Sequence, residues 1–348
     1  MRAIQRDRHH DKGASGKRRS LTLALLVAAP LLFIACPKEE RPDVRGGMST
    51  RPQPANSAAP IPGAVAFNGE RAMEHVRKQL DFGPRPPGSP ELAKTRLYIS
   101  NELKTYGLSF TTDEFRASTP QGEKNMANIT AEIPGESKDV IIIASHYDSK
   151  YFKDMRFVGA NDPGTSVGTL LELGRVLAAN RQQQKPKFTY WLVFFDGEES
   201  FCEEWNECSK PDAPDNTYGA RHYVSQLRAR NELSRVRVLI LLDMMGHQDL
   251  KLSRDETSTK WLVDTIWQTA REMGYGAQFV NETQSVGGDD YDPFLQEGIE
   301  SVDIIQFFPQ WHRADDTLEN VSAKSMKIVG DVVLASLPRI EQHLASKR

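Results

Sequence analysis

Three short apolar runs, separated by helical segments, constrain the fold of this chain more than any other feature. Their sequences are VIIIA, YWLVFF and VRVLILL, at Val140–Ala144, Tyr190–Phe195 and Val236–Leu242. Short runs rich in β-branched and aromatic residues are typical of strands that are buried on both faces of a sheet. Helical segments lie between them, at Thr165–Ala179 and Tyr218–Arg228. This alternation predicts an α/β fold with a mostly parallel central sheet and helices on both faces.

Further elements surround this unit, and no linker interrupts them. The periodicity of apolar residues and the Ser89-Pro90 helix start predict helices at Gly69–Leu80, Ser89–Gly107, Lys260–Met273 and Ala323–Leu344, and strands at Leu108–Arg116, Asn125–Ile133 and Val302–Gln306. We therefore expect one globular catalytic domain over residues 65–348.

The 44 basic and 47 acidic residues give a net charge of −3. This charge argues against a nucleic-acid partner, because proteins that bind nucleic acids carry a surplus of basic residues.

The N-terminal 64 residues have a different character. A basic stretch that includes Arg18-Arg19, a partial twin-arginine signal, precedes the 15-residue apolar run Leu21–Ala35. This run is short for a membrane span, so we expect a signal peptide at residues 1–35, with a retained membrane anchor as the alternative. Cys36 follows a segment similar to a bacterial lipoprotein cleavage box, which predicts lipidation there. The Pro-rich residues 36–64 read as a disordered tether, and we expect an exported, periplasmic or otherwise extracytoplasmic protein.

Acidic and histidine side chains gather where the expected strands end. His146 and Asp148 follow the first run, Glu198 and Glu199 the second, and Asp243 the third, while His312 follows the late strand. The carboxyl ends of parallel strands lie at one edge of a sheet, so these side chains are expected to meet there. Carboxylate and imidazole donors without a thiolate suit zinc in an open catalytic site. The pattern predicts a zinc enzyme.

Several of these residues also allow simpler interpretations. Asp162 precedes Pro163 at the start of a helix and is suited to be a helix N-cap. Glu198 and Glu199 are compatible with a solvated turn, and His312 beside Trp311 with an ordinary surface pair. Asp243 resists such an explanation, because a carboxylate at the end of an apolar strand needs a partner.

Three motifs in one order resemble a known family. They are HYDSKYF at His146–Phe152, FVGAND at Phe157–Asp162 and FDGEE at Phe195–Glu199. They are similar to the animal-type glutaminyl cyclases, which share a fold with the zinc aminopeptidases. The similarity runs from about Phe67 to the end and includes Tyr218–His222, Leu241–Asp243, Asp289-Asp290, Pro293–Leu295 and Trp311-His312. The resemblance implies an α/β/α sandwich and a glutaminyl-peptide cyclotransferase, an acyltransferase that converts the N-terminal Gln of peptides or proteins to pyroglutamate and releases ammonia.

The resemblance also implies a role for individual residues. It assigns one zinc ion to Asp162, Glu199 and His312, the acid/base role to Glu198, a supporting hydrogen-bonded carboxylate pair to Asp243 and Asp289, and the walls of the substrate pocket to Trp205 and Trp311. The placement of Trp205 requires a small insertion after Glu199. The animal-type cyclases carry a histidine on the late strand where this chain has Asp303.

A zinc metalloaminopeptidase is the alternative function. Two zinc ions would then lie among His146, Asp162, Glu199, Asp243 and His312, with His146 and Asp243 serving the second ion, and Glu198 would activate a water. The two tryptophans favour the cyclase, whereas Asp316-Thr317 after His312 is more typical of aminopeptidases. A non-catalytic binding lipoprotein with this fold is a third class, disfavoured because every catalytic position is filled.

Cys202 and Cys208 lie close together in a polar loop beside the expected site. In an exported protein they are suited to form a disulfide that braces the loop carrying Trp205. Two free thiols remain an alternative, and zinc ligation is the least favoured, because two more ligands would be needed nearby. We expect a monomer that meets a membrane only through its signal or lipid anchor and whose partners are its peptide substrates.

Overall fold

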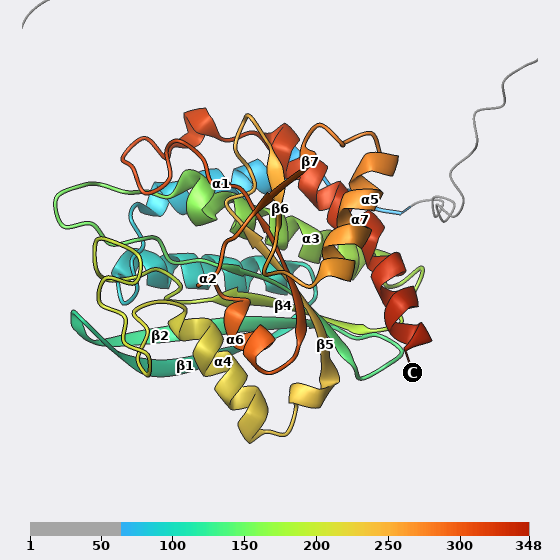
Figure 1. Ribbon diagram of the computed structural model, residues 1–348, viewed down its shortest axis with the longest axis horizontal. Helices are drawn as coiled ribbons and strands as arrows, with labels where there is room; N and C mark the ends of the chain where they lie inside the picture. The colour runs from blue at the N-terminus through green and yellow to red at the C-terminus, as the bar shows by residue number, and fades with distance from the viewer. Residues whose placement is uncertain (1–63, 348) are drawn as a thin grey trace, which may run out of the picture. The chain divides into compact units, whose positions relative to one another are not determined.

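A mixed sheet of six strands forms the centre of residues 64–347, the part of the chain that this computed structural model describes (Figure 1). The strand order is β1 (Ser109–Thr119), β2 (Gly122–Ile133), β4 (Thr189–Phe195), β3 (Val140–His146), β5 (Val236–Asp243) and β8 (Glu300–Ile305). The four strands β4, β3, β5 and β8 are parallel, while β2 pairs antiparallel with β4 and β1 antiparallel with β2. The predicted mostly parallel sheet is confirmed.

Helices cover both faces of this sheet, as Figure 1 shows. One face packs against α1 (Gly69–Phe82), α2 (Pro90–Thr105), α3 (Ser166–Asn180), α5 (Lys260–Glu272) and α7 (Ala323–Ser346), and the other against α4 (Tyr218–Ala229) and α6 (Asp292–Gln296). Strand β3 shows why both faces are apolar. Ile141 and Ile143 belong to the core under α1, α3 and α7, whereas Ile142 and Ala144 belong to the core under α4. Successive side chains of a strand point to opposite faces, so a strand covered on both sides is apolar throughout.

The ends of two predicted helices follow from their caps. The Ser89 hydroxyl accepts a hydrogen bond from Leu92 N at 3.1 Å, and the Asn68 side chain accepts from Glu70 N and Arg71 N at the start of α1.

A few short elements were not predicted: β6 (Leu252–Asp255) and β7 (Phe279–Gln284), which form a small parallel sheet, α6, and the single turns η1 (Ala160–Thr165), η2 (Leu233–Arg235) and η3 (Leu318–Asn320).

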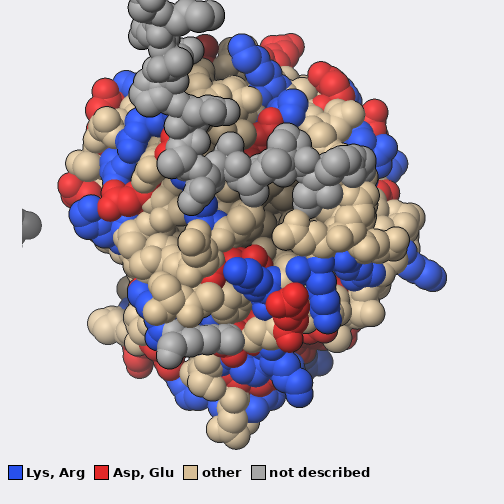
Figure 2. Space-filling view, turned by 90° about the vertical axis from the view of Figure 1, so that its right-hand side faces the viewer, with Lys and Arg blue, Asp and Glu red and all other residues tan. Residues whose placement is uncertain are grey.

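The expected signal peptide, Cys36 and the tether up to residue 63 lie outside the described residues, so the boundaries at 35 and 64 remain predictions. Within residues 64–347, no helix has both the length and the apolar character needed to cross a membrane. On the face shown in Figure 2, the coloured Lys and Arg side chains are interspersed with Asp and Glu, as expected from the small net charge.

Candidate active site at the carboxyl edge of the sheet

The parallel strands end in register and bring their last residues to one edge. His146, the last residue of β3, pairs with Phe195 at the end of β4, and Asp243 at the end of β5 pairs with Ile305 at the end of β8. The loops that follow β4 and β8 therefore begin beside His146 and Asp243. They carry Glu198, Glu199 and His312, so the strand order accounts for the convergence of side chains that are far apart in the sequence.

Two groups of metal-binding side chains share one aspartate. In the first, His312 Nε2 lies 3.3 Å from Glu199 Oε2 and 3.5 Å from Asp162 Oδ2. In the second, His146 Nε2 lies 3.3 Å from Asp162 Oδ1 and 3.2 Å from Asp243 Oδ1. Asp162 thus faces both histidines with different oxygens. The structure brings together the ligand set expected for one zinc ion and, beside it, the set expected for a second.

The first group fits a metal ion on its own chemistry. Neither carboxylate oxygen of Glu199 accepts a hydrogen bond from the described residues, although both are buried. Burial opposes the charge of Glu199, yet the neighbouring His312 lowers its pKa to about 2. An ionised, buried carboxylate without a hydrogen-bond donor is costly unless it is paired or coordinates a metal. One imidazole and two carboxylates offer nitrogen and oxygen donors of the kinds that bind zinc.

The loop before α3 holds Asp162 in place. Gly159 has a φ of 55°, and a Cβ there would lie only 1.9 Å from the carbonyl oxygen of Asp162, so this turn requires glycine. Asp316 accepts hydrogen bonds from Asn161 N at 2.8 Å and from Asp162 N at 3.1 Å. The side chain of Asp162 faces the two histidines and does not cap α3, which excludes the helix-cap interpretation. Burial, followed by the charge of Glu199, raises its pKa to about 6.

A buried aspartate orients the loop that carries the two glutamates. Asp148 Oδ1 accepts hydrogen bonds from Gly197 N at 2.8 Å and Glu198 N at 3.1 Å, and its Oδ2 accepts from Glu199 N at 3.3 Å. Glu198 and Glu199 are only 5% and 2% exposed, so the solvated-turn interpretation is wrong. One carboxylate that satisfies three successive amides fixes both glutamates relative to the sheet.

Glu198 lies in a group of buried carboxyls. Burial raises its pKa well above the ordinary value, and the charges of Asp289, Glu199 and Asp290 act in the same direction, while His146 opposes them. The pKa of Asp289 is raised to about 7 by burial and by Asp243. Burial, followed by the charges of Asp289 and Asp243, raises the pKa of Asp303 well above its ordinary value, so these three carboxyls lie near one another. Asp243 also lies against His146.

A cavity of about 230 Å³ opens directly above these residues. Its polar side is formed by Glu198, Asp289 and the first group of metal-binding residues. The other side is apolar and is formed by Trp205, Met244, Val286, Ile305, Phe307 and Trp311. Trp311 stacks on His312 with ring centroids 4.3 Å apart, which excludes an ordinary surface pair and places an aromatic wall beside a metal-binding residue.

Two non-glycine residues of this cavity have left-handed backbones. Met244, directly after Asp243, has a φ of 45°, and His312 has a φ of 54°. Such conformations are costly for residues with a side chain and are found most often at functional sites. At both positions the chain turns sharply, and the side chain of each residue lines the cavity.

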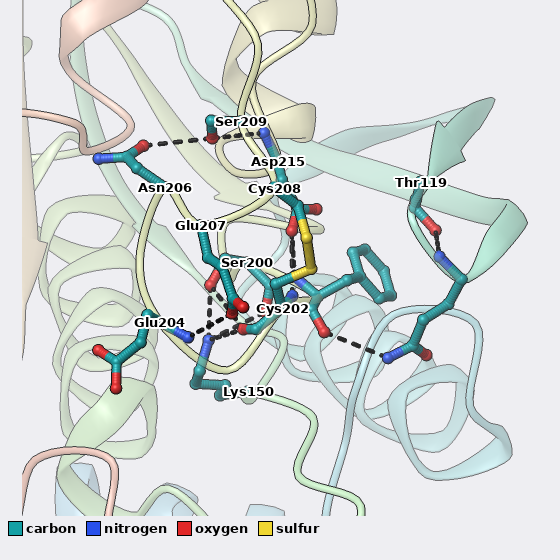
Figure 3. The surroundings of a disulfide bond; sticks show 12 residues. Thr119, Lys150, Ser200, Cys202, Glu204, Asn206, Glu207, Cys208, Ser209 and Asp215 are labelled. Atoms are coloured by element: carbon teal, nitrogen blue, oxygen red, sulfur yellow. Dashed lines mark hydrogen bonds between the residues drawn. A yellow bond between two sulfur atoms is a disulfide. The ribbon is translucent and has the colours of Figure 1, made fainter. Parts of the chain in front are cut away.

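Cys202 and Cys208 form a disulfide with a Cα–Cα distance of 6.0 Å (Figure 3). Other residues near the site were given no role by sequence reasoning: Arg85, Asp148, Lys150, Asp215, Asp303 and Asp316. All are charged residues that are buried. Several of them lie in or next to the motifs quoted above, and that position was the only signal in the sequence.

The model of peptidase family M28 matches residues 128–337, a segment that contains almost all of the site. The chain belongs to peptidase family M28. Among its curated M28 relatives, the glutaminyl-peptide cyclotransferase of Bos taurus is 30% identical over 285 residues, which cover 68% of this chain and 73% of that protein.

The fold of this chain is similar to solved structures of two kinds, described as glutaminyl cyclases and as aminopeptidases. A glutaminyl cyclase of an Acidobacteriales bacterium is 34% identical with a TM-score of 0.74, over 83% of this chain and 100% of that chain. A leucine aminopeptidase precursor from Bacteroides thetaiotaomicron is 26% identical with a TM-score of 0.72, over 79% and 98%. The identification with glutaminyl cyclases of the zinc aminopeptidase fold is confirmed. The fold alone does not separate the two activities.

Proposed function

We propose that this protein is a zinc-dependent glutaminyl-peptide cyclotransferase that acts on peptides and proteins with an N-terminal Gln. The observation that carries the proposal is the small cavity between Trp205 and Trp311, which opens on Glu198 and on one group of metal-binding residues. A cavity of about 230 Å³ suits one side chain folded back on its own amine. The names of the curated and structural relatives support the same activity.

The reaction needs a proton carrier and a dry, shaped pocket. The α-amino nitrogen of Gln attacks the carbon of its own side-chain amide, a C–N bond forms, and the bond to the amide nitrogen breaks. Asp162, Glu199 and His312 would hold a zinc ion, whose charge would polarise the amide oxygen. Glu198 takes a proton from the attacking amine and delivers it to the departing nitrogen, which leaves as ammonia. Its raised pKa suits it to hold that proton.

The remaining pocket residues orient the reactants. Asp289 lies near enough to Glu198 for its charge to raise the pKa of that carboxyl, and Asp303 lies near Asp289 in turn. The rings of Trp205 and Trp311 exclude water and hold the substrate chain in the folded conformation that cyclisation requires. No nucleophile from the protein is needed, because the substrate supplies its own.

A metalloaminopeptidase is the second candidate, and one observation favours it. His146 and Asp243 form a second donor group with the shared Asp162, so the site has ligands for two ions. Glu198 would then take a proton from an attacking water and give it to the departing amine, and the first peptide bond would be hydrolysed. The similarity to a protein described as a leucine aminopeptidase precursor is compatible with this reaction.

Incubation of the full-length zinc-loaded protein with the dipeptide Gln-Ala, followed by mass spectrometry, tests these alternatives. Loss of ammonia with the peptide bond intact supports the cyclase, with one bound zinc per chain. Free Gln and Ala would overturn the proposal in favour of the peptidase, with two zinc ions. Bound zinc without either product would indicate a non-catalytic protein. The Glu198→Gln variant is the control for the catalysed reaction.

We also propose that the protein is an exported monomer attached to a bacterial membrane through Cys36. The basic and apolar residues 1–35 and the Pro-rich residues 36–64 support this assignment, and the Cys202–Cys208 disulfide suits an oxidising compartment. Fractionation of cells that express the protein tests it. Intact chain that retains residues 1–35 in the cytoplasm would contradict export, and a Cys36→Ala variant that stays on the membrane would contradict the lipid anchor.

A further inference from the structure

We propose that the Cys202–Cys208 disulfide is the positioning element of the substrate pocket: it holds Trp205 over the reacting groups, and its reduction opens the pocket while the metal-binding residues stay in place. This inference rests on the proposed function, because it assigns Trp205 to the wall of the cyclase pocket. The disulfide closes the loop at residues 202–208 (Figure 3). Trp205 is the middle residue of this segment in the sequence.

The chain between Glu199 and the disulfide is held without any help from the sulfur atoms. The buried Lys150 Nζ donates hydrogen bonds to Ser200 Oγ at 2.6 Å, to the Ser200 carbonyl at 3.0 Å and to the Cys202 carbonyl at 3.1 Å. Asp215, also buried, accepts from Phe201 N at 3.1 Å and Cys202 N at 3.0 Å. Charge-assisted hydrogen bonds of buried groups are strong, so Glu199 keeps its position when the disulfide opens.

The residues beyond Cys202 have much weaker ties to the rest of the protein. The hydrogen bonds of Glu204 and Glu207 shown in the described structure run mainly between these two residues, at 3.2 and 3.3 Å. Asn206 ties the loop to its surroundings: its Oδ1 accepts from Asn216 Nδ2 at 3.0 Å and from Ser209 Oγ at 3.3 Å, and its carbonyl accepts from Ser209 N at 3.1 Å. Asn206 itself has a left-handed φ of 67°. The covalent bond between Cys202 and Cys208 restrains this segment in addition to these hydrogen bonds.

The loop also carries charges of one sign. Glu203, Glu204 and Glu207 are all exposed, and they lie within a ring that two cysteines close. Like charges so near one another favour a more open arrangement of the chain. The disulfide opposes that tendency, and reduction therefore favours movement of Trp205 away from its contact.

The contact of Trp205 is a glycine of the opposite wall. A Cβ at Gly288 would lie 2.9 Å from Trp205 Nε1, so the indole rests directly on the backbone next to Asp289. Both residues line the cavity. A displaced indole opens the cavity to water at Glu198 and Asp289, whereas Asp162 and Glu199 are held by Asp316 and Asp148. Reduction should therefore alter substrate binding and leave zinc affinity unchanged.

The experiment compares the full-length wild-type protein with the double variant Cys202→Ala/Cys208→Ala, each before and after treatment with a water-soluble trialkylphosphine. The phosphine and one water convert the disulfide to two thiols and a phosphine oxide, so phosphorus is oxidised and sulfur reduced. We expect the KM for Gln-Ala to rise about tenfold in the reduced wild type and in the double variant, as for a pocket that loses an apolar wall. The phosphine should have no further effect on the double variant.

Two further measurements separate this proposal from the proposed function. Hydrogen exchange at residues 203–207 and 286–289 should accelerate on reduction, and zinc affinity from competition with a chelator should stay within about twofold. Both can be measured without turnover. Trp205→Ala should itself raise KM, and reduction of this variant should change KM little, because the two changes act on one contact. An unchanged KM and exchange rate on reduction would overturn the proposal, as would a parallel loss of zinc.

Discussion

Replacement of Asp148 by Asn tests whether one buried carboxylate preorganises the site. The Asn oxygen can still accept from Gly197 N and Glu198 N, but its amide group would face Glu199 N, which now donates to Asp148 Oδ2 at 3.3 Å. Loss of a hydrogen bond to a charged group costs about 1.5–3 kcal/mol, and an unpaired buried donor adds about 1–3 kcal/mol. The charge of Asp148 raises the pKa of the neighbouring Asp196, so the two carboxylates repel each other. Removal of this repulsion by the substitution offsets about 1 kcal/mol of the loss in stability.

We therefore expect Asp148→Asn to lower the free energy of unfolding of the metal-free protein by about 1.5–5 kcal/mol. Because Glu199 shifts, zinc affinity should fall by about 10–100-fold, the range seen for residues that orient metal ligands. Denaturant titration in the presence of a chelator measures the first quantity, and competition with a coloured chelator the second. Asp154→Asn, the same change at an exposed position, is the matched control. If Asp148→Asn matches this control in both quantities, the argument from the three amides is wrong.

Three further predictions follow from the same structure. Glu198→Gln should lower kcat by about 10²–10⁴-fold and keep zinc affinity within about threefold, because Glu198 carries a proton and binds no metal; a kcat within tenfold of wild type would contradict this role. Removal of zinc by a chelator should abolish turnover, and one equivalent of zinc should restore it; restoration that needs two equivalents would contradict the single-ion site. Burial, with Arg71 and Arg175, lowers the pKa of His75 to about 4 from 6.5. Between pH 4 and 6.5 only the unfolded chain is protonated at His75. The contribution of this histidine to the free energy of unfolding is therefore fully present above pH 6.5 and decreases by about 1.4 kcal/mol per pH unit as the pH falls below that value. Denaturant titrations at pH 7 and pH 5 measure how much the free energy of unfolding falls between these values. That fall should be about 2 kcal/mol smaller in His75→Gln than in the wild type, and an equal fall in both would contradict the role of His75.

The central sheet was predictable because its strands are buried on both faces. Val140–Ala144, Tyr190–Phe195 and Val236–Leu242 are apolar at every position or nearly so, and such runs have few alternatives in a chain of this length. The strands β6 and β7 escaped prediction for the opposite reason. They are short, and half of the residues of β7 are exposed, so neither the composition nor the alternation of apolar residues marks them. Their position depends on contacts with other elements, as where β6 lies beside β8 and β7 beside α5.

The sequence predicted the metal-binding residues of the site well, and the residues that orient them much less well. His146 and Asp243 end strands, while Glu199 and His312 come in the segments after strands. The rule for parallel sheets therefore places all four at one edge. Asp162 was ambiguous, because Asp before Pro serves equally well as a helix cap, and only the folded loop shows which way its carboxylate points.

The residues that orient this loop and its neighbours could not be assigned from the sequence. Asp148, Asp316 and Lys150 act through backbone amides and carbonyls that come close only in the folded chain. A charged residue with such a role resembles a surface residue until its burial is known. Support of this kind therefore has no spacing or periodicity of its own.

We expect the loops, and not the sheet, to decide between cyclisation and hydrolysis. The strand ends supply donors for one metal or two, and the M28 fold carries both kinds of relative. Trp205 and Trp311 come from the segments that follow β4 and β8, and they close a space sized for one folded side chain. Such a space favours attack by the substrate's own amine, because a second reactant has little room beside it. If this reasoning holds, Trp205→Ala should raise hydrolysis relative to cyclisation of Gln-Ala, and an unchanged ratio of the two products would show that the metal ligands decide the reaction.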